Sequence, residues 1–135
     1  MSVLKINRFE TCDYALVSQE GKLSIIGIFD RIFVQNLPAQ HSSMCFVVVA
    51  EGAPKSDYKI IFVIKNPSGK KLNEIPMNIK TNDAGYFNVI ANLNNLPITE
   101  QGILTIECYG GDTKLGTKEL IISKAPQFQG SRTKN

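Results

Sequence analysis

The residue types that usually carry out chemistry are sparse in this chain. The single histidine, His41, lies in a segment after Pro38 and next to two serines. A serine nucleophile needs a base in contact with its hydroxyl, which sequence neighbours seldom achieve, and the chain has no Gly-x-Ser-x-Gly turn to expose a serine. A hydrolase with an unconventional site at His41 remains only as a third hypothesis. We predict no catalytic residue and expect that the protein is not an enzyme.

The sequence also lacks the usual patterns of metal-binding residues. The three cysteines, Cys12, Cys45 and Cys108, are far apart and odd in number, so a complete disulfide framework is excluded. They lack the close Cys-x-x-Cys pair of most thiolate metal sites, and we expect them to be reduced packing residues. Calcium needs about six oxygen ligands, whereas the aspartates are scattered among separate turns. We therefore predict no metal site and no cofactor.

The excess positive charge of +3 lies entirely at the C-terminal end of the chain. Lys124, Arg132 and Lys134 follow Ser123, and the acidic and basic residues before them balance. A neutral body does not provide the continuous basic face that nucleic acid requires. We predict a single domain at residues 1–123, a flexible basic C-terminal tail at residues 124–135, and no binding of nucleic acid.

Short runs of Val, Ile, Phe and Tyr, separated by turn residues, dominate the chain. This spacing is typical of strands, and no window has the apolar pattern of a helix. We predict an all-β fold, an antiparallel β-sandwich of about eight strands. The apolar runs are too short to cross a membrane and the N-terminus lacks a signal-peptide pattern. We expect a cytoplasmic protein with no transmembrane segment.

Alternation within the runs predicts which side chains face the core. Leu104, Ile106 and Cys108 are expected to point inward, and Glu107 outward. The run at residues 46–49 is apolar on both faces, as in a central strand or one covered by a loop. Lys59 and Lys65 bracket another apolar run, which we interpret as charges that discourage pairing at a sheet edge.

Four segments are more specific than strand composition requires: Cys12-Asp13-Tyr14-Ala15, Glu20-Gly21-Lys22-Leu23, Ile26-Gly27-Ile28-Phe29-Asp30, and Leu37-Pro38-Ala39 with His41. Together they resemble the N-terminal signature of a family of small uncharacterised bacterial proteins. The stretch around Gly85-Tyr86-Phe87 is similar to hairpins of immunoglobulin-like and C2-like sandwiches. The resemblance implies a bacterial sandwich and transfers no catalytic residue.

Four polar residues of the signature have two interpretations. Asp13, Asp30, Arg31 and His41 either stabilise bends or gather at one end of the sandwich as a recognition patch, since loops carry function in such folds. Gly27, inside a strand, indicates a bulge or a close approach of two backbones. Our main hypothesis is a non-enzymatic interaction module that binds a protein partner or its own copy. The alternative is a C2-like sandwich that binds a small ligand, a lipid or calcium.

Overall fold

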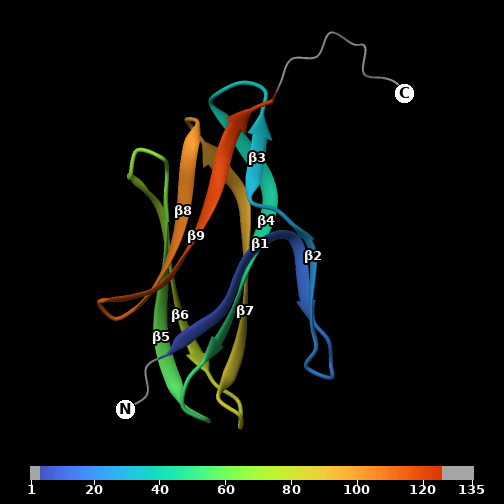
Figure 1. Cartoon of the computed structure of the whole chain (residues 1–135), viewed down its shortest axis with the longest axis vertical. Helices are drawn as coiled ribbons and strands as arrows, with labels where there is room; N and C mark the ends of the chain where they lie inside the picture. The colour runs from blue at the N-terminus through green and yellow to red at the C-terminus, as the bar shows by residue number, and fades with distance from the viewer. Residues whose placement is uncertain (1–3, 126–135) are drawn as a thin grey trace.

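The computed structural model describes residues 4–125, which form nine β-strands. Their bounds are β1 Lys5–Val17, β2 Leu23–Ile28, β3 Arg31–Val34, β4 Ala39–Glu51, β5 Asp57–Lys65, β6 Lys71–Lys80, β7 Tyr86–Ile98, β8 Gly102–Gly110 and β9 Thr113–Lys124. Figure 1 shows them as two layers. None of the described residues belongs to a helix of the length and hydrophobicity that a membrane span requires.

The strands form two sheets that pack face to face. One sheet has the order β2-β1-β4-β7 and the other has the order β3-β9-β8-β5-β6. The predicted β-sandwich is confirmed, and all but one of the strand pairs are antiparallel. The exception is β3, which pairs with β9 in parallel. This pairing joins segments that are far apart in the chain, so local periodicity did not indicate it.

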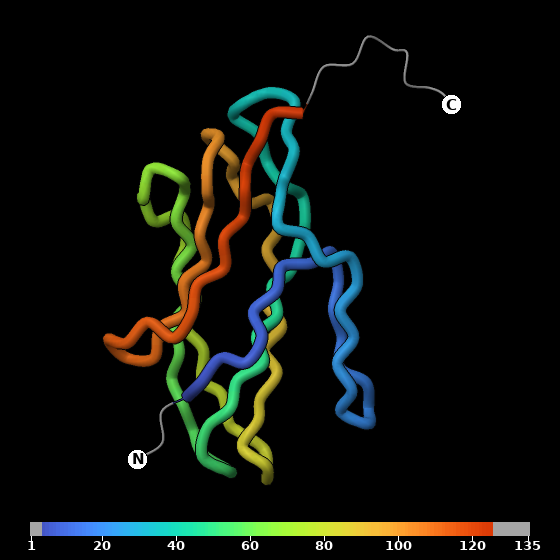
Figure 2. The backbone as a smooth tube through the Cα atoms, in the orientation of Figure 1, coloured from blue at the N-terminus to red at the C-terminus, as the bar shows by residue number. Residues whose placement is uncertain are grey.

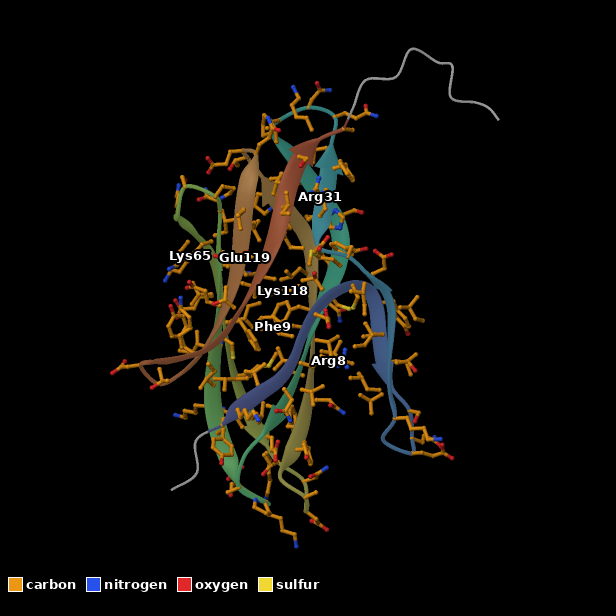
Figure 3. All side chains as sticks on the ribbon, in the orientation of Figure 1. Arg8, Phe9, Arg31, Lys65, Lys118 and Glu119 are labelled. Carbon is orange, nitrogen blue, oxygen red and sulfur yellow. The ribbon has the colours of Figure 1, made fainter. Side chains whose placement is uncertain are left out.

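The core lies between the two sheets and is built from alternate residues of each strand. Phe46 of β4 and Phe62 of β5 are fully buried, with ring centroids 4.7 Å apart. Phe9 of β1 contacts both rings from between the layers (Figure 3), with centroids at 6.1 and 6.2 Å. Offset aromatic contacts at these distances stabilise a core beyond the area that they bury. Leu104, Ile106 and Cys108 join the core as predicted.

The first strand, β1, has two parts. Its first part pairs with β4 as far as Cys12, and its second part pairs only with β2. Residues 12–28, which we call the arm, therefore form a hairpin that projects from the body (Figure 2). Leu23 and Ile25 of the arm pack on a second apolar cluster that includes Cys45 and Val47. The arm thus explains why β4 is apolar on both faces.

Two of the turns are closed by an asparagine side chain. In the β5–β6 turn, the Asn66 side-chain oxygen accepts a hydrogen bond from the Lys70 backbone N–H at 2.9 Å. In the β6–β7 turn, the Asn82 side-chain oxygen accepts one from Tyr86 N–H, also at 2.9 Å. Such asparagine bonds mimic a backbone turn and hold the ends of each hairpin together.

Two other predictions need correction. Strand β5 pairs with β8 from Ile61 to Lys65, so Lys65 does not protect a sheet edge, whereas Lys59 lies where β5 pairs with β6 alone. Lys65 instead forms an ion pair across the sheet with Glu107. The domain boundary predicted after Ser123 is displaced slightly, because Lys124 is still part of β9. The rest of the predicted basic tail, from residue 126 onward, lies outside the described residues.

Candidate interaction surface

Three of the four residues predicted to form a recognition patch lie together. Asp13 of β1, Arg31 of β3 and His41 of β4 line a pocket of about 280 Å³, with Gly27, Ile28, Phe29, Ile32 and Phe33. Asp30 does not join them. It borders a different depression, formed with residues 117–121 of β9, and its backbone oxygen accepts a hydrogen bond from Ile121 N–H at 2.9 Å. The predicted patch therefore has three members.

His41 also differs from its expected setting, because β4 begins at Ala39 and places it within a strand. Its ring packs against Phe29, with ring centroids 5.9 Å apart. The His41 Nε2 atom is buried and has no hydrogen-bond partner among the described residues. Burial of an unsatisfied polar atom costs about 1–3 kcal/mol, so this nitrogen is a point where a bound group would gain a contact.

Thr11 fixes the base of the arm through two hydrogen bonds to Phe29. The buried Thr11 hydroxyl donates a hydrogen bond to the Phe29 carbonyl at 2.6 Å, and Phe29 N–H donates to the Thr11 carbonyl at 3.0 Å. Nearby, Gly27 has a φ of 73°, and any Cβ at this position would collide with the Asp13 carboxylate. The predicted bulge or close approach of two backbones is not found at Gly27, because the register of β1 and β2 is regular there and the nearest atoms belong to the Asp13 side chain. The glycine instead leaves room for Asp13 at the pocket.

One face of the arm exposes large apolar side chains. Tyr14 lies directly opposite Ile26, and Leu16 and Ile28 are each two residues further along their strands. Residues at this spacing share a face in a regular strand, as Tyr14, Leu16 and Ile26 do here. Ile28 follows Gly27, which has a positive φ, and is exposed although its partner Cys12 is buried. Tyr14 is 57% exposed and Ile26 and Ile28 are each 55% exposed. We call these four side chains the arm face. Phe33, which lines the pocket and is also 57% exposed, extends this apolar surface. The Arg31 guanidinium carbon lies over the Phe33 ring, 5.9 Å from the ring centroid.

The arm face was not predicted from the sequence. A signal was present in the sequence: Ile25 and Ile26 are adjacent and must point to opposite sides of a strand. A hairpin with apolar side chains on both faces buries both of them only if other parts of the structure pack on each face. The body of the protein covers Ile25 and leaves Ile26 exposed.

The arm also ends in an unprotected sheet edge. Natural edge strands avoid unwanted pairing through charges, prolines or short length. Strand β6 contains Pro76 and lysines, β7 contains Pro97, and β3 has only 4 residues. Strand β2 is the remaining edge strand, and its sequence from Leu23 to Ile28 contains neither a charge nor a proline. Its outer backbone groups are available to another strand.

A second polar cluster lies on the outer face of the five-stranded sheet. Glu107 was expected to face solvent, but its side chain is only 9% exposed. Its carboxylate contacts the ammonium groups of Lys65 and Lys114, each at 3.1 Å, and accepts a hydrogen bond from Tyr109 at 2.9 Å. Burial opposes ionisation of Glu107, but these three donors outweigh it and lower its pKa. The cluster stabilises the ionised carboxylate.

Within residues 4–125, no three His, Cys, Asp or Glu side chains gather closely enough to hold a metal ion. In the pocket, Arg31 offers hydrogen-bond donors, Asp13 offers acceptors, and His41 offers one nitrogen. With the apolar arm face beside them, these groups are suited to recognition of a partly apolar surface.

Comparison with known proteins gives a family and a structural likeness. The model of DUF6941, a family of unknown function, matches residues 7–123. An immunoglobulin-like protein from Pseudomonas aeruginosa, whose crystal structure is known, is similar over 89% of this chain and 96% of its own, with 13% identity and a TM-score of 0.46. Comparison with curated proteins finds no match.

Proposed function

The chain belongs to the DUF6941 family, and because the function of that family is unknown, we propose one from the geometry. We propose that the protein is a non-enzymatic interaction module, and that its partner at the arm is a second copy of itself. The observation that supports this most is the arm face beside an edge strand without charge or proline. Large exposed apolar patches on soluble proteins commonly mark contact sites.

Charge favours a second copy over an unrelated partner. The pocket end of the arm has one acid and one base, Asp13 and Arg31, and the tip has Glu20 and Lys22. Each end is thus close to neutral, with one acidic and one basic side chain. The tip of one arm can therefore lie opposite the pocket end of the other without repulsion. A two-fold axis would run through the edge of β2 and pair this strand with its counterpart in antiparallel order. In this arrangement no block of like charges meets another.

The number of residues in the arm and pocket wall can be compared with that of a typical contact. A stable interface needs about 800 Å² from each partner, supplied by roughly 20–30 residues. This is about one-tenth of the 8220 Å² surface of the chain. The arm together with the pocket wall, residues 12–34, is a segment of that size. Backbone pairing along β2 would supply the hydrogen bonds and join the two arms into one continuous sheet. The two arm faces would then lie side by side on the same face of that sheet, and their side chains next to the two-fold axis would contact each other.

Sedimentation velocity over a concentration series tests this proposal. We expect a species of twice the 14.9 kDa chain mass at high concentration. Ile26→Lys places like charges across the two-fold axis and is expected to weaken the dimer about tenfold or more. The matched control is Ile103→Lys, which replaces a 47% exposed isoleucine on the other sheet and should leave the dimer intact. Circular dichroism confirms that both variants are folded.

Two results would contradict the proposal. A wild-type protein that stays monomeric at all concentrations excludes a second copy as the occupant of the arm. Equal dissociation by Ile26→Lys and Ile103→Lys shows that dimerisation does not involve the arm.

A second candidate function is binding of a small ligand in the pocket. The buried, unpartnered Nε2 of His41, near Arg31 and Asp13, favours it. Such a ligand would have an acidic group for Arg31 and a hydrogen-bond donor for His41. A thermal-shift screen of small carboxylic acids tests it. Stabilisation by a compound that is lost in His41→Phe would support this function, and a screen without any response would reject it.

A further inference from the structure

Two of the three cysteines face each other where the arm leaves the body. Cys12 and Cys45 are direct partners at the last pair of residues between β1 and β4. Their sulfur atoms are 3.1 Å apart, and one thiol donates a hydrogen bond to the other. Both side chains are fully buried in the second apolar cluster, beneath Leu23 and Ile25 of the arm. Cys108 lies apart from them, in the core between the sheets.

The backbone geometry at this pair suits a covalent bond. Directly opposite residues of antiparallel strands have Cα atoms about 4.5–5.5 Å apart. Disulfides span Cα separations of about 4.4–6.8 Å. Because the two thiols already touch, the bond requires rotation of side chains and no movement of the strands.

We propose that Cys12 and Cys45 are a redox pair that forms a disulfide with a low-molecular-weight disulfide as oxidant. One cysteine, as its thiolate, attacks the oxidant and releases one small thiol. The second thiolate then attacks the resulting mixed disulfide, forms the Cys12–Cys45 bond and releases the other small thiol. The two cysteines lose two protons and two electrons in total, and the oxidant gains them as it becomes two thiols.

The bond controls the attachment of the arm. Burial, followed by contact with Cys45, raises the pKa of Cys12 to about 12, so little thiolate is present at neutral pH. The oxidant reaches the pair only when the arm lifts from Cys45. Once formed, the disulfide joins β1 to β4 at the base of the arm and holds the two strands together there. Formation of the bond thus requires that the pair becomes accessible, and the bond then keeps the base of the arm attached to β4.

Mass spectrometry after treatment with oxidised glutathione tests the proposal. The protein is oxidised in mildly alkaline buffer, unfolded, and alkylated. We expect a chain two hydrogens lighter before alkylation, with one cysteine alkylated, and tryptic peptides 9–22 and 32–55 joined by a disulfide. The bond closes a loop from Cys12 to Cys45, for which chain entropy predicts a rise in Tm on the order of 10 °C.

Two variants make the test specific. Cys108→Ser is expected to keep the linked peptides, whereas Cys45→Ser is expected to lose them together with the rise in Tm. Alkylation of all three cysteines after oxidation would overturn the proposal, as would a persistent mixed disulfide or a bond that includes Cys108. These readouts do not depend on whether the protein is a dimer.

Discussion

The buried carboxylate of Glu107 leads to a quantitative prediction about stability. Glu107→Gln keeps the shape of the side chain and removes its charge. The pair with Lys65, whose side chain is about one-third exposed, accounts for about 0.5–1 kcal/mol. In the variant, the Tyr109 hydroxyl donates to a neutral amide oxygen instead of a charged carboxylate. This weaker hydrogen bond adds about 0.5–1 kcal/mol to the loss of stability. Lys114 is largely solvated, so we assign no energy to it. The expected loss is about 1–2 kcal/mol at neutral pH.

The dependence of this loss on pH identifies its cause. The pKa of Glu107 is lower in the folded protein than in the unfolded chain. Its contribution to stability is therefore complete above the pKa of the unfolded chain, about 4.3, and disappears as the pH falls through the lower, folded value. The stability difference between wild type and Glu107→Gln should shrink over the same acidic range and vanish below it.

Urea unfolding at a series of pH values measures this difference. The matched control is Glu119→Gln, which removes the same charge from an exposed position on the neighbouring strand β9 (Figure 3). This control is expected to change the free energy of unfolding by less than about 0.5 kcal/mol. The reasoning is refuted if Glu107→Gln costs the same at acidic and neutral pH, or no more than Glu119→Gln.

Three other substitutions test the core and the pocket. Phe62→Ala removes a ring that packs on Phe46 and should cost about 3–5 kcal/mol in urea unfolding; a cost below about 1 kcal/mol would show that the core is not packed as described. Gly27→Ala should destabilise the protein by about 1–3 kcal/mol, because the residue has a positive φ and its Cβ would collide with Asp13; an unchanged Tm would contradict this. His41→Phe removes an unpartnered buried nitrogen and should be neutral or stabilising in thermal unfolding, whereas a large loss of Tm would show that the nitrogen has a structural partner.

Sequence patterns predicted the features that depend on neighbouring residues. Alternation identified the inward side chains of β8, which are Leu104, Ile106 and Cys108. Their placement depends only on the direction of successive side chains along one strand. The expected membership of a family of unknown function is also confirmed, and the family model matches residues 7–123.

Features that depend on which strands are neighbours could not be predicted in this way. Lys65 was interpreted as protection for an edge, but its strand is internal and its partner Glu107 lies on another strand. Asp30 and Arg31 are adjacent in sequence, yet they border different depressions because successive residues of an extended chain point in opposite directions. The arm was missed because nothing local shows that β1 leaves β4 after Cys12.

The most direct test of the proposed function is amide hydrogen exchange at the edge of β2, followed as a function of protein concentration. Dimerisation through this edge predicts that the N–H groups of Leu23–Ile28 that point away from β1 become protected as concentration rises. The edge strands β3, β6 and β7 should keep their exchange rates. Unchanged exchange in β2 at concentrations where a dimer is present, or new protection at another edge, would contradict the account.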